Sequence, residues 1–62
     1  MAFQHREYRI GPLFAFALWD SSYGWLVKQK GTNEETARNA AKTQMKQKYL
    51  NKGLTVPDWL NE

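Results

Sequence analysis

The apolar residues of this chain change their period at Gly31. Before this glycine they alternate with polar residues or form short β-prone runs, as in strands, whereas after it they recur every three to four residues, as in helices. A chain of 62 residues has room for one domain and buries only about 60% of its unfolded surface, so both parts must share one core. The sequence therefore predicts a single α+β domain over residues 1–62, a three-stranded antiparallel sheet with one helix packed on one face (β-β-β-α) and a short C-terminal closing segment.

Three strands are expected before Gly31. Residues 3–10 mix charged and aromatic side chains, residues 13–19 form a continuous β-prone run, and residues 25–30 form the third strand. Gly11-Pro12 and the turn-forming residues 20–24 separate them. A four-residue loop at 20–23 would place Leu18 opposite Trp25.

This register predicts two different sheet faces, because side chains alternate along a strand. The expected core face holds Phe14, Phe16, Leu18, Trp25 and Val27. The expected solvated face, which we call the open sheet face, holds Ala15, Ala17, Trp19, Leu26, Lys28 and Lys30.

The segment after Gly31 carries the signals of a helix and of both its ends. Thr32, with Glu35 three residues later, matches a capping box, and Gly53 favours the left-handed conformation that ends many helices. The stripe expected to face the sheet is Ala37, Ala40, Ala41 and Met45, with Tyr49 at its margin. Beyond the helix, Val56, Trp59 and Leu60 are expected to fold back and close the core.

The reactive side chains argue against catalysis. The chain has one histidine, His5, close to its N-terminus, and no cysteine. A triad of Ser21 or Ser22 with Asp20 would need neighbours in one turn to adopt a geometry that they do not present. The glycines are scattered singly, so there is no phosphate-binding loop. We expect a non-enzymatic protein that uses neither a cofactor nor a metal.

The charge and the apolar runs bear on compartment and partner. The formal net charge is +3, from nine Lys/Arg against six Asp/Glu, and this balance permits contact with nucleic acid without requiring it. No apolar run reaches the roughly 18 residues of a membrane span, and the lack of cysteine fits a reducing compartment. A cytoplasmic location and no membrane partner are expected.

Two surfaces are candidates for binding a partner. The first is the open sheet face around Trp19, Lys28 and Lys30, where a ring lies beside two long cations, with Arg9 expected alongside. The second is a row of cations spaced four residues apart along the helix: Arg38, Lys42 and Lys46. Both also fit ordinary solvated faces, on which lysines limit aggregation. Three tryptophans in so small a fold should leave at least one partly exposed, which favours a protein partner or a homo-oligomer.

One pattern resembles a known family. A threonine cap, an acidic residue, an Asn-Ala pair, a helix-ending glycine and a Val-Pro pair occur in order at Thr32, Glu35, Asn39, Ala40, Gly53, Val56 and Pro57. In this pattern the segment 31–57 resembles the N-terminal domain of HicB-like antitoxins. The Pro-Gly-bearing stretch usual in that family is missing, and Thr36 stands where an alanine is expected. The resemblance implies a sheet-plus-helix module that binds and blocks a protein partner.

The order of elements is also similar to that of the N-terminal arm-binding domains of tyrosine integrases, which lay a three-stranded sheet in the major groove of DNA. This sheet carries few basic residues for that role. The leading expectation is a small regulator that modulates or inhibits a protein partner, antitoxin-like or of phage or mobile-element type. The alternative is a nucleic-acid-binding module that uses the open sheet face, and a subunit of a homo-oligomer is the third reading.

Overall fold

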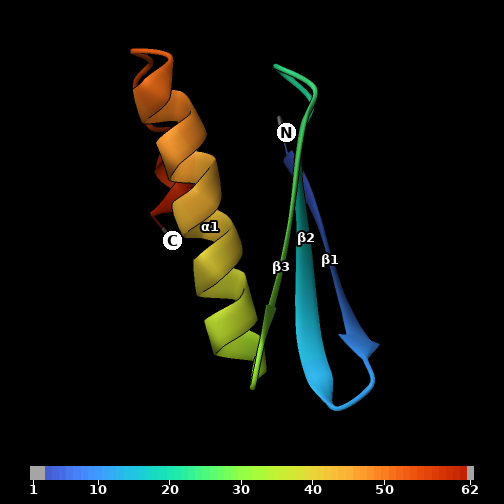
Figure 1. Cartoon of the computed structure of the whole chain (residues 1–62). Coiled ribbons are helices and arrows are strands. Elements are labelled where there is room, and N and C mark those ends of the chain that lie inside the picture. The colour runs from blue at the N-terminus through green and yellow to red at the C-terminus, as the bar shows by residue number, and fades with distance from the viewer. Residues whose placement is uncertain (1–2, 62) are drawn as a thin grey trace.

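The computed structural model describes residues 3–61, and it confirms the predicted α+β fold. The strands are β1 (Phe3–Ile10), β2 (Leu13–Asp20) and β3 (Trp25–Gly31), followed by the helix α1 (Glu34–Asn51) and a short 3-10 helix, η1 (Asp58–Leu60). The sheet is antiparallel in the order β1-β2-β3. Figure 1 shows α1 along one face of the sheet, with β1 on the far side of β2 and β3 from the helix.

The turn between β1 and β2 is a two-residue loop, because Ile10 pairs with Leu13. Gly11 has a φ of +58°, and Pro12 fixes its own φ near −65°. A glycine with positive φ in the first loop position is what a type II′ hairpin turn requires. This turn sets the register of the whole β1–β2 pair.

The predicted pairing of β2 with β3 was wrong by two residues. Leu18 lies opposite Val27, and Asp20 lies opposite Trp25. The Asp20 carboxylate accepts from the Ser22 amide at 2.9 Å, and the Asp20 carbonyl accepts from the Gly24 amide at 2.9 Å. These bonds keep Asp20 in the strand and Gly24, with a φ of +72°, in the loop. A slip of two residues leaves every side chain on its predicted face.

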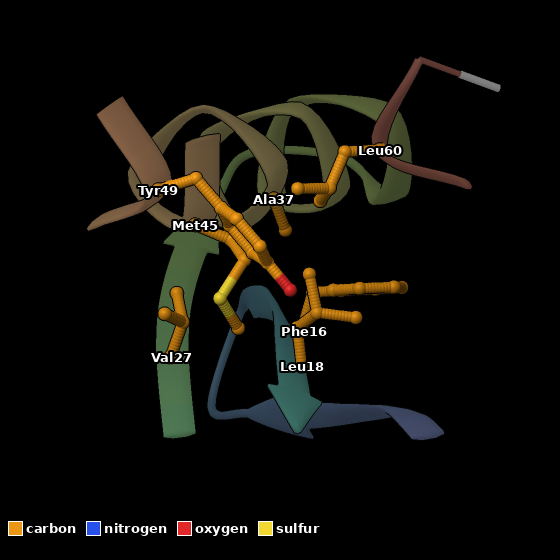
Figure 2. Close-up of a cluster of buried hydrophobic side chains, with 8 residues drawn as sticks. Phe16, Leu18, Val27, Ala37, Met45, Tyr49 and Leu60 are labelled. Atoms are coloured by element: carbon orange, nitrogen blue, oxygen red, sulfur yellow. The ribbon is translucent and has the colours of Figure 1, made fainter. Parts of the chain in front are cut away.

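The core lies between β2, β3 and α1, as Figure 2 shows. Phe16, Leu18 and Val27 from the sheet are buried against the helix residues Ala37, Ala41, Met45 and Tyr49. Tyr49 was expected at the margin of the stripe, but only 5% of it is exposed. Phe14 and Trp25 are partly buried against the same cluster.

The C-terminal segment closes the core as predicted. Leu60 is buried, and Val56 and Trp59 pack against the core cluster. The Trp59 ring stacks on Phe3, with the ring centroids 4.3 Å apart and an interplanar angle of 10°. This contact ties the start of β1 to η1.

The helix begins one residue later than predicted. The N-cap is Asn33, not Thr32, and its side-chain oxygen accepts a hydrogen bond from the Thr36 amide at 2.8 Å. Asn33 has extended backbone angles (φ −146°, ψ 171°), and asparagine is among the best N-cap residues. The predicted capping box of Thr32 and Glu35 is therefore wrong.

The end of the helix is as predicted. Gly53 has a φ of +71°, its amide donates to the Leu50 carbonyl at 3.0 Å, and the Leu54 amide donates to the Tyr49 carbonyl at 2.9 Å. This pair of bonds is a Schellman motif. It turns the chain back towards the core.

The helix is not centred on the sheet. It packs against β3 and β2, while β1 lies beyond its edge (Figure 1). The core-side side chains of β1 are consequently less covered, and His5, Glu7 and Arg9 are all exposed. This offset leaves a groove between β1 and α1.

Candidate binding surface on the open sheet face

The observed register places three rows of side chains across the open sheet face. Gln4, Trp19 and Leu26 form the first row, Arg6, Ala17 and Lys28 the second, and Tyr8, Ala15 and Lys30 the third. The three residues predicted for this surface, Trp19, Lys28 and Lys30, are thus on one face. The structure adds Arg6 and Tyr8 from β1 to them.

The charge of this face has one sign. Arg6 on β1 and Lys28 and Lys30 on β3 are all exposed. The carboxylates among residues 3–61 lie on the other face of β1, in the core, at the start of the helix and in η1: Glu7, Asp20, Glu34, Glu35 and Asp58. The described part of the open sheet face therefore carries three cations and no anion.

The cations lie on the two outer strands, and small residues lie between them. Arg6 and Lys28 flank Ala17 from opposite sides, and two strand spacings separate their backbones by about 10 Å. Ala15 is only 3% exposed, although α1 covers the opposite face, because Tyr8 and Lys30 flank it. The face is therefore a strip of small side chains between two outer strands that carry the cations.

Exposed apolar side chains lie at both ends of this face: Ile10 beside the β1–β2 turn, 42% exposed, and a pair near the β2–β3 turn. Trp19 is 37% exposed and its cross-strand neighbour Leu26 is 53% exposed. The other two tryptophans are half-buried against other rings: Trp25 meets Tyr49 edge-on at 5.1 Å, and Trp59 stacks on Phe3. The prediction that at least one tryptophan is partly exposed is confirmed, and Trp19 is the most exposed of the three.

The second predicted surface, the row Arg38, Lys42 and Lys46, does not form one continuous site. Arg38 and Lys42 line a groove of about 370 Å³ between β1 and α1, together with Phe3, His5, Glu7, Phe16 and Trp59. Lys46 follows on the same side of α1 but is not part of the groove lining. Glu7 adds a negative charge to this groove, so it lacks the single sign of the open sheet face.

His5 lies in this groove as an aromatic side chain. Its ring stacks on Phe16 with centroids 5.5 Å apart and an interplanar angle of 7°. Arg9 was expected alongside the open sheet face, and this was wrong. The β1–β2 register puts it opposite Phe14, on the same side of β1 as His5, and its guanidinium lies 4.4 Å from the Phe14 ring centroid. Among residues 3–61, no three His, Cys, Asp or Glu side chains come together in a way that would hold a metal ion.

Sequence reasoning missed a buried polar pair. The Tyr49 hydroxyl donates a hydrogen bond to the carboxylate of Asp20, which is fully buried. Burial, followed by the hydrogen bond to Asp20 and its negative charge, raises the pKa of Tyr49 well above its usual range. The signal was the alternation of β2, since Asp20 follows Phe16 and Leu18 on the core face. The pair is structural and does not reach the open sheet face.

Sequence reasoning also missed Arg6 and Tyr8. Their position follows once Gly11-Pro12 is taken as a two-residue hairpin loop, because Ile10 opposite Leu13 puts Arg6 opposite Ala17. No helix among the described residues is long and apolar enough to cross a bilayer.

Comparisons of the chain with models of protein families, with curated proteins and with solved structures gave no significant match. The resemblances to HicB-like antitoxins and to integrase arm-binding domains stay predictions.

Proposed function

We propose that this chain is a non-enzymatic binding domain that binds nucleic acid through its open sheet face. The observation that carries the proposal is the positive charge of that face: Arg6, Lys28 and Lys30 are exposed on it, and the described carboxylates lie elsewhere. Lysine and arginine bind phosphates and release condensed counterions, which is the main source of affinity for nucleic acid.

The spacing of the strands supports a duplex groove as the target. The major groove of B-DNA is about 12 Å wide, and the outer strands are about 10 Å apart. Cations on both outer strands would face the phosphates on the two sides of the groove. The middle strand would present Ala17 and Trp19 to the base edges, where an alanine methyl can contact the methyl group of thymine.

The environment of the reactive groups supports a role without catalysis. The His5 ring stacks on Phe16, and the Asp20 carboxylate is engaged by Tyr49 and by the Ser22 amide. Neither side chain lies on the open sheet face. The surface that carries the proposal thus offers charge, rings and methyl groups, which serve binding.

The test is the salt dependence of binding to a labelled DNA duplex, followed by fluorescence anisotropy. We expect the logarithm of affinity to fall with the logarithm of salt concentration, with a slope of about −0.9 for each phosphate contact. The double change Lys28→Glu with Lys30→Glu should lower affinity at low salt by at least about tenfold and make the slope shallower by about two.

A matched control separates this face from net charge alone. Arg38→Glu with Lys46→Glu makes the same change in formal charge on the helix. Circular dichroism must first show that both double variants fold. If the helix variant loses as much affinity as the sheet variant, or if the wild type does not bind the duplex at low salt, the open sheet face is not a nucleic-acid interface.

A protein partner is the second candidate, favoured by Trp19 and Leu26. These neighbours on the open sheet face are 37% and 53% exposed, and tryptophan is enriched at interface hot spots. The HicB-like pattern of segment 31–57 implies the same role: a regulator that modulates or inhibits its partner. The cap at Asn33 removes the threonine cap from that pattern.

The two candidates depend on different side chains of one face. Affinity capture from the native host, with and without nuclease, gives the first separation. Capture of a protein partner should survive nuclease treatment and moderate salt, and it should be lost in the Leu26→Ala variant. Leu50→Ala is the matched control, because Leu50 is 57% exposed on the helix. Capture of nucleic acid should instead be lost in the double variant Lys28→Glu with Lys30→Glu.

A further inference from the structure

Strand β1 is an edge of the sheet with both of its faces largely uncovered. It pairs along its whole length with β2 on one side, and α1 packs over β2 and β3 instead of over β1 (Figure 1). Six of its eight residues are exposed. A regular edge strand of this kind offers a row of backbone donors and acceptors to another strand.

The opposite edge is poorly suited to pairing with its own copy. Lys28 and Lys30 stand on the same face of β3, and lysines on an edge strand oppose edge-to-edge association. Strand β3 also carries Gln29, which hydrogen-bonds to Gln44 on α1. Strand β1 carries charges of both signs, Glu7 beside Arg6 and Arg9, whereas the charges of β3 are all positive, so β1 is the edge better suited to self-association.

The charges of β1 select one register for antiparallel pairing with its own copy. Residues directly opposite one another share a face, so even positions must meet even positions and odd must meet odd. A pair centred on Arg6 puts His5 opposite Glu7 but brings Arg6 against itself, and one centred on Glu7 brings Glu7 against itself. A pair centred on His5 forms no acid–base contact.

The register centred on Tyr8 is different. It puts Glu7 opposite Arg9 of the second copy, and by symmetry it forms this contact twice. Tyr8 then lies opposite Tyr8 on the open sheet face, where facing aromatic residues stabilise strand pairs. Arg9 is already held in place by the Phe14 ring, 4.4 Å from its guanidinium.

We propose that the chain forms a two-fold symmetric dimer in which β1 pairs with β1 of a second copy, over residues 6–10 and centred on Tyr8. Two three-stranded sheets then become one continuous sheet. Its open face carries Arg6, Lys28 and Lys30 twice, and the helices lie apart on the other side. The proposal rests on β1 alone and holds whichever partner the open sheet face binds.

The absence of cysteine from the chain allows a direct test of the register. In Tyr8→Cys the two introduced thiols lie opposite each other, with Cβ atoms about 4.5–5.5 Å apart, close to disulfide geometry. Gln4→Cys is the control on the same face of β1. Its two thiols lie about 26 Å apart, because a strand advances by about 3.3 Å per residue.

Both variants are oxidised at several protein concentrations, after circular dichroism has shown that they fold. We expect a disulfide-linked dimer from Tyr8→Cys and none from Gln4→Cys. Equal cross-linking of both variants would mean random collision and would overturn the proposal. No cross-link from folded Tyr8→Cys at the highest concentration would overturn it as well.

A charge exchange tests the contact in the dimer without introducing cysteine. Sedimentation velocity at low salt measures the dissociation constant, which we expect in the micromolar range or weaker because the paired segment is short. Glu7→Arg should raise it about tenfold or more, since two attractive contacts become repulsive. Arg9→Glu should do the same, and the double exchange should restore the wild-type value.

The restoration distinguishes pairing from loss of fold. A wild type that stays monomeric throughout the concentration series overturns the proposal. A dissociation constant that Glu7→Arg leaves unchanged would place the contact elsewhere on the molecule and overturn the proposal. So would a double variant whose dimer is as weak as those of the single variants.

Discussion

The hydroxyl of Tyr49, in the last turn of α1, donates a hydrogen bond to the buried carboxylate of Asp20 at the end of β2. Asp20 also accepts from the Ser22 amide, at 2.9 Å. One side chain therefore holds the β2–β3 turn and anchors the C-terminal end of the helix to the sheet. Trp25 packs edge-on against the Tyr49 ring at 5.1 Å.

Removing the Tyr49 hydroxyl should destabilise the fold. Tyr49→Phe keeps the ring and leaves a buried carboxylate with one partner fewer, a loss that we expect to lower the free energy of unfolding by about 1–3 kcal/mol. Urea denaturation measures it. Tyr23→Phe is the control, because Tyr23 is 48% exposed and should change stability little. An equal loss in both variants would contradict a specific role for the Asp20 bond.

The same hydroxyl should make stability depend on alkaline pH. Burial and Asp20 raise the pKa of Tyr49 in the folded state, whereas an unfolded tyrosine has a pKa of about 10. Above that pH the unfolded chain releases the proton while the folded chain keeps it, so the free energy of unfolding falls as pH rises, by up to about 1.4 kcal/mol per pH unit.

Comparison with Tyr49→Phe isolates this effect, because the other tyrosines and the lysines titrate in both proteins. Denaturant melts between pH 9 and 11 should show a steeper fall for the wild type. Parallel curves over that range would mean that the Tyr49 hydroxyl is not held in its protonated form by the fold.

The core depends on Phe16, which is 4% exposed and lies at the centre of the sheet. Phe16→Ala should cost about 3–5 kcal/mol through lost burial and the cavity left behind, close to the whole stability of so small a domain. Thermal melting followed by circular dichroism measures it. Leu26→Ala, on the open sheet face, is the comparison and should leave the melting temperature nearly unchanged.

The position of the helix cap gives a paired prediction. Asn33→Ala removes the acceptor of the Thr36 amide and should cost about 1 kcal/mol. Thr32→Ala, one residue earlier, should cost much less. Denaturant melts of the two variants test this, and a larger loss from Thr32→Ala would restore the capping box expected from the sequence.

The sequence was sufficient for the order of elements and for the sheet faces because periodicity is a local property. The change at Gly31 separates strands from helix, and it coincides with a close approach: a Cβ on Gly31 would lie 2.7 Å from the Ala37 backbone nitrogen. The stripe of Ala37, Ala41 and Met45 follows from helical spacing, and the end of the helix from Gly53.

The details that sequence reasoning got wrong depend on competition between neighbours. Threonine and asparagine both cap helices well, and only the structure shows that the Asn33 side chain accepts from the Thr36 amide. The β2–β3 register depends on Asp20, whose carboxylate serves the turn and Tyr49 together. Such a contact joins residues far apart in sequence, which no local pattern reveals. Arg6 could be assigned to the candidate site only once the β1–β2 register was known.

The offset of α1 also divides the domain by local stability. Strand β1 is held by its backbone bonds to β2 and by the Phe3–Trp59 stack, whereas β2 and β3 share the buried core with the helix. Segments with few buried contacts open without global unfolding. Native-state hydrogen exchange should therefore release the β1 amides that bond to β2 well before the amides between Leu18 and Val27. At concentrations that populate the dimer, exchange should slow in β1 while the core amides keep their rates.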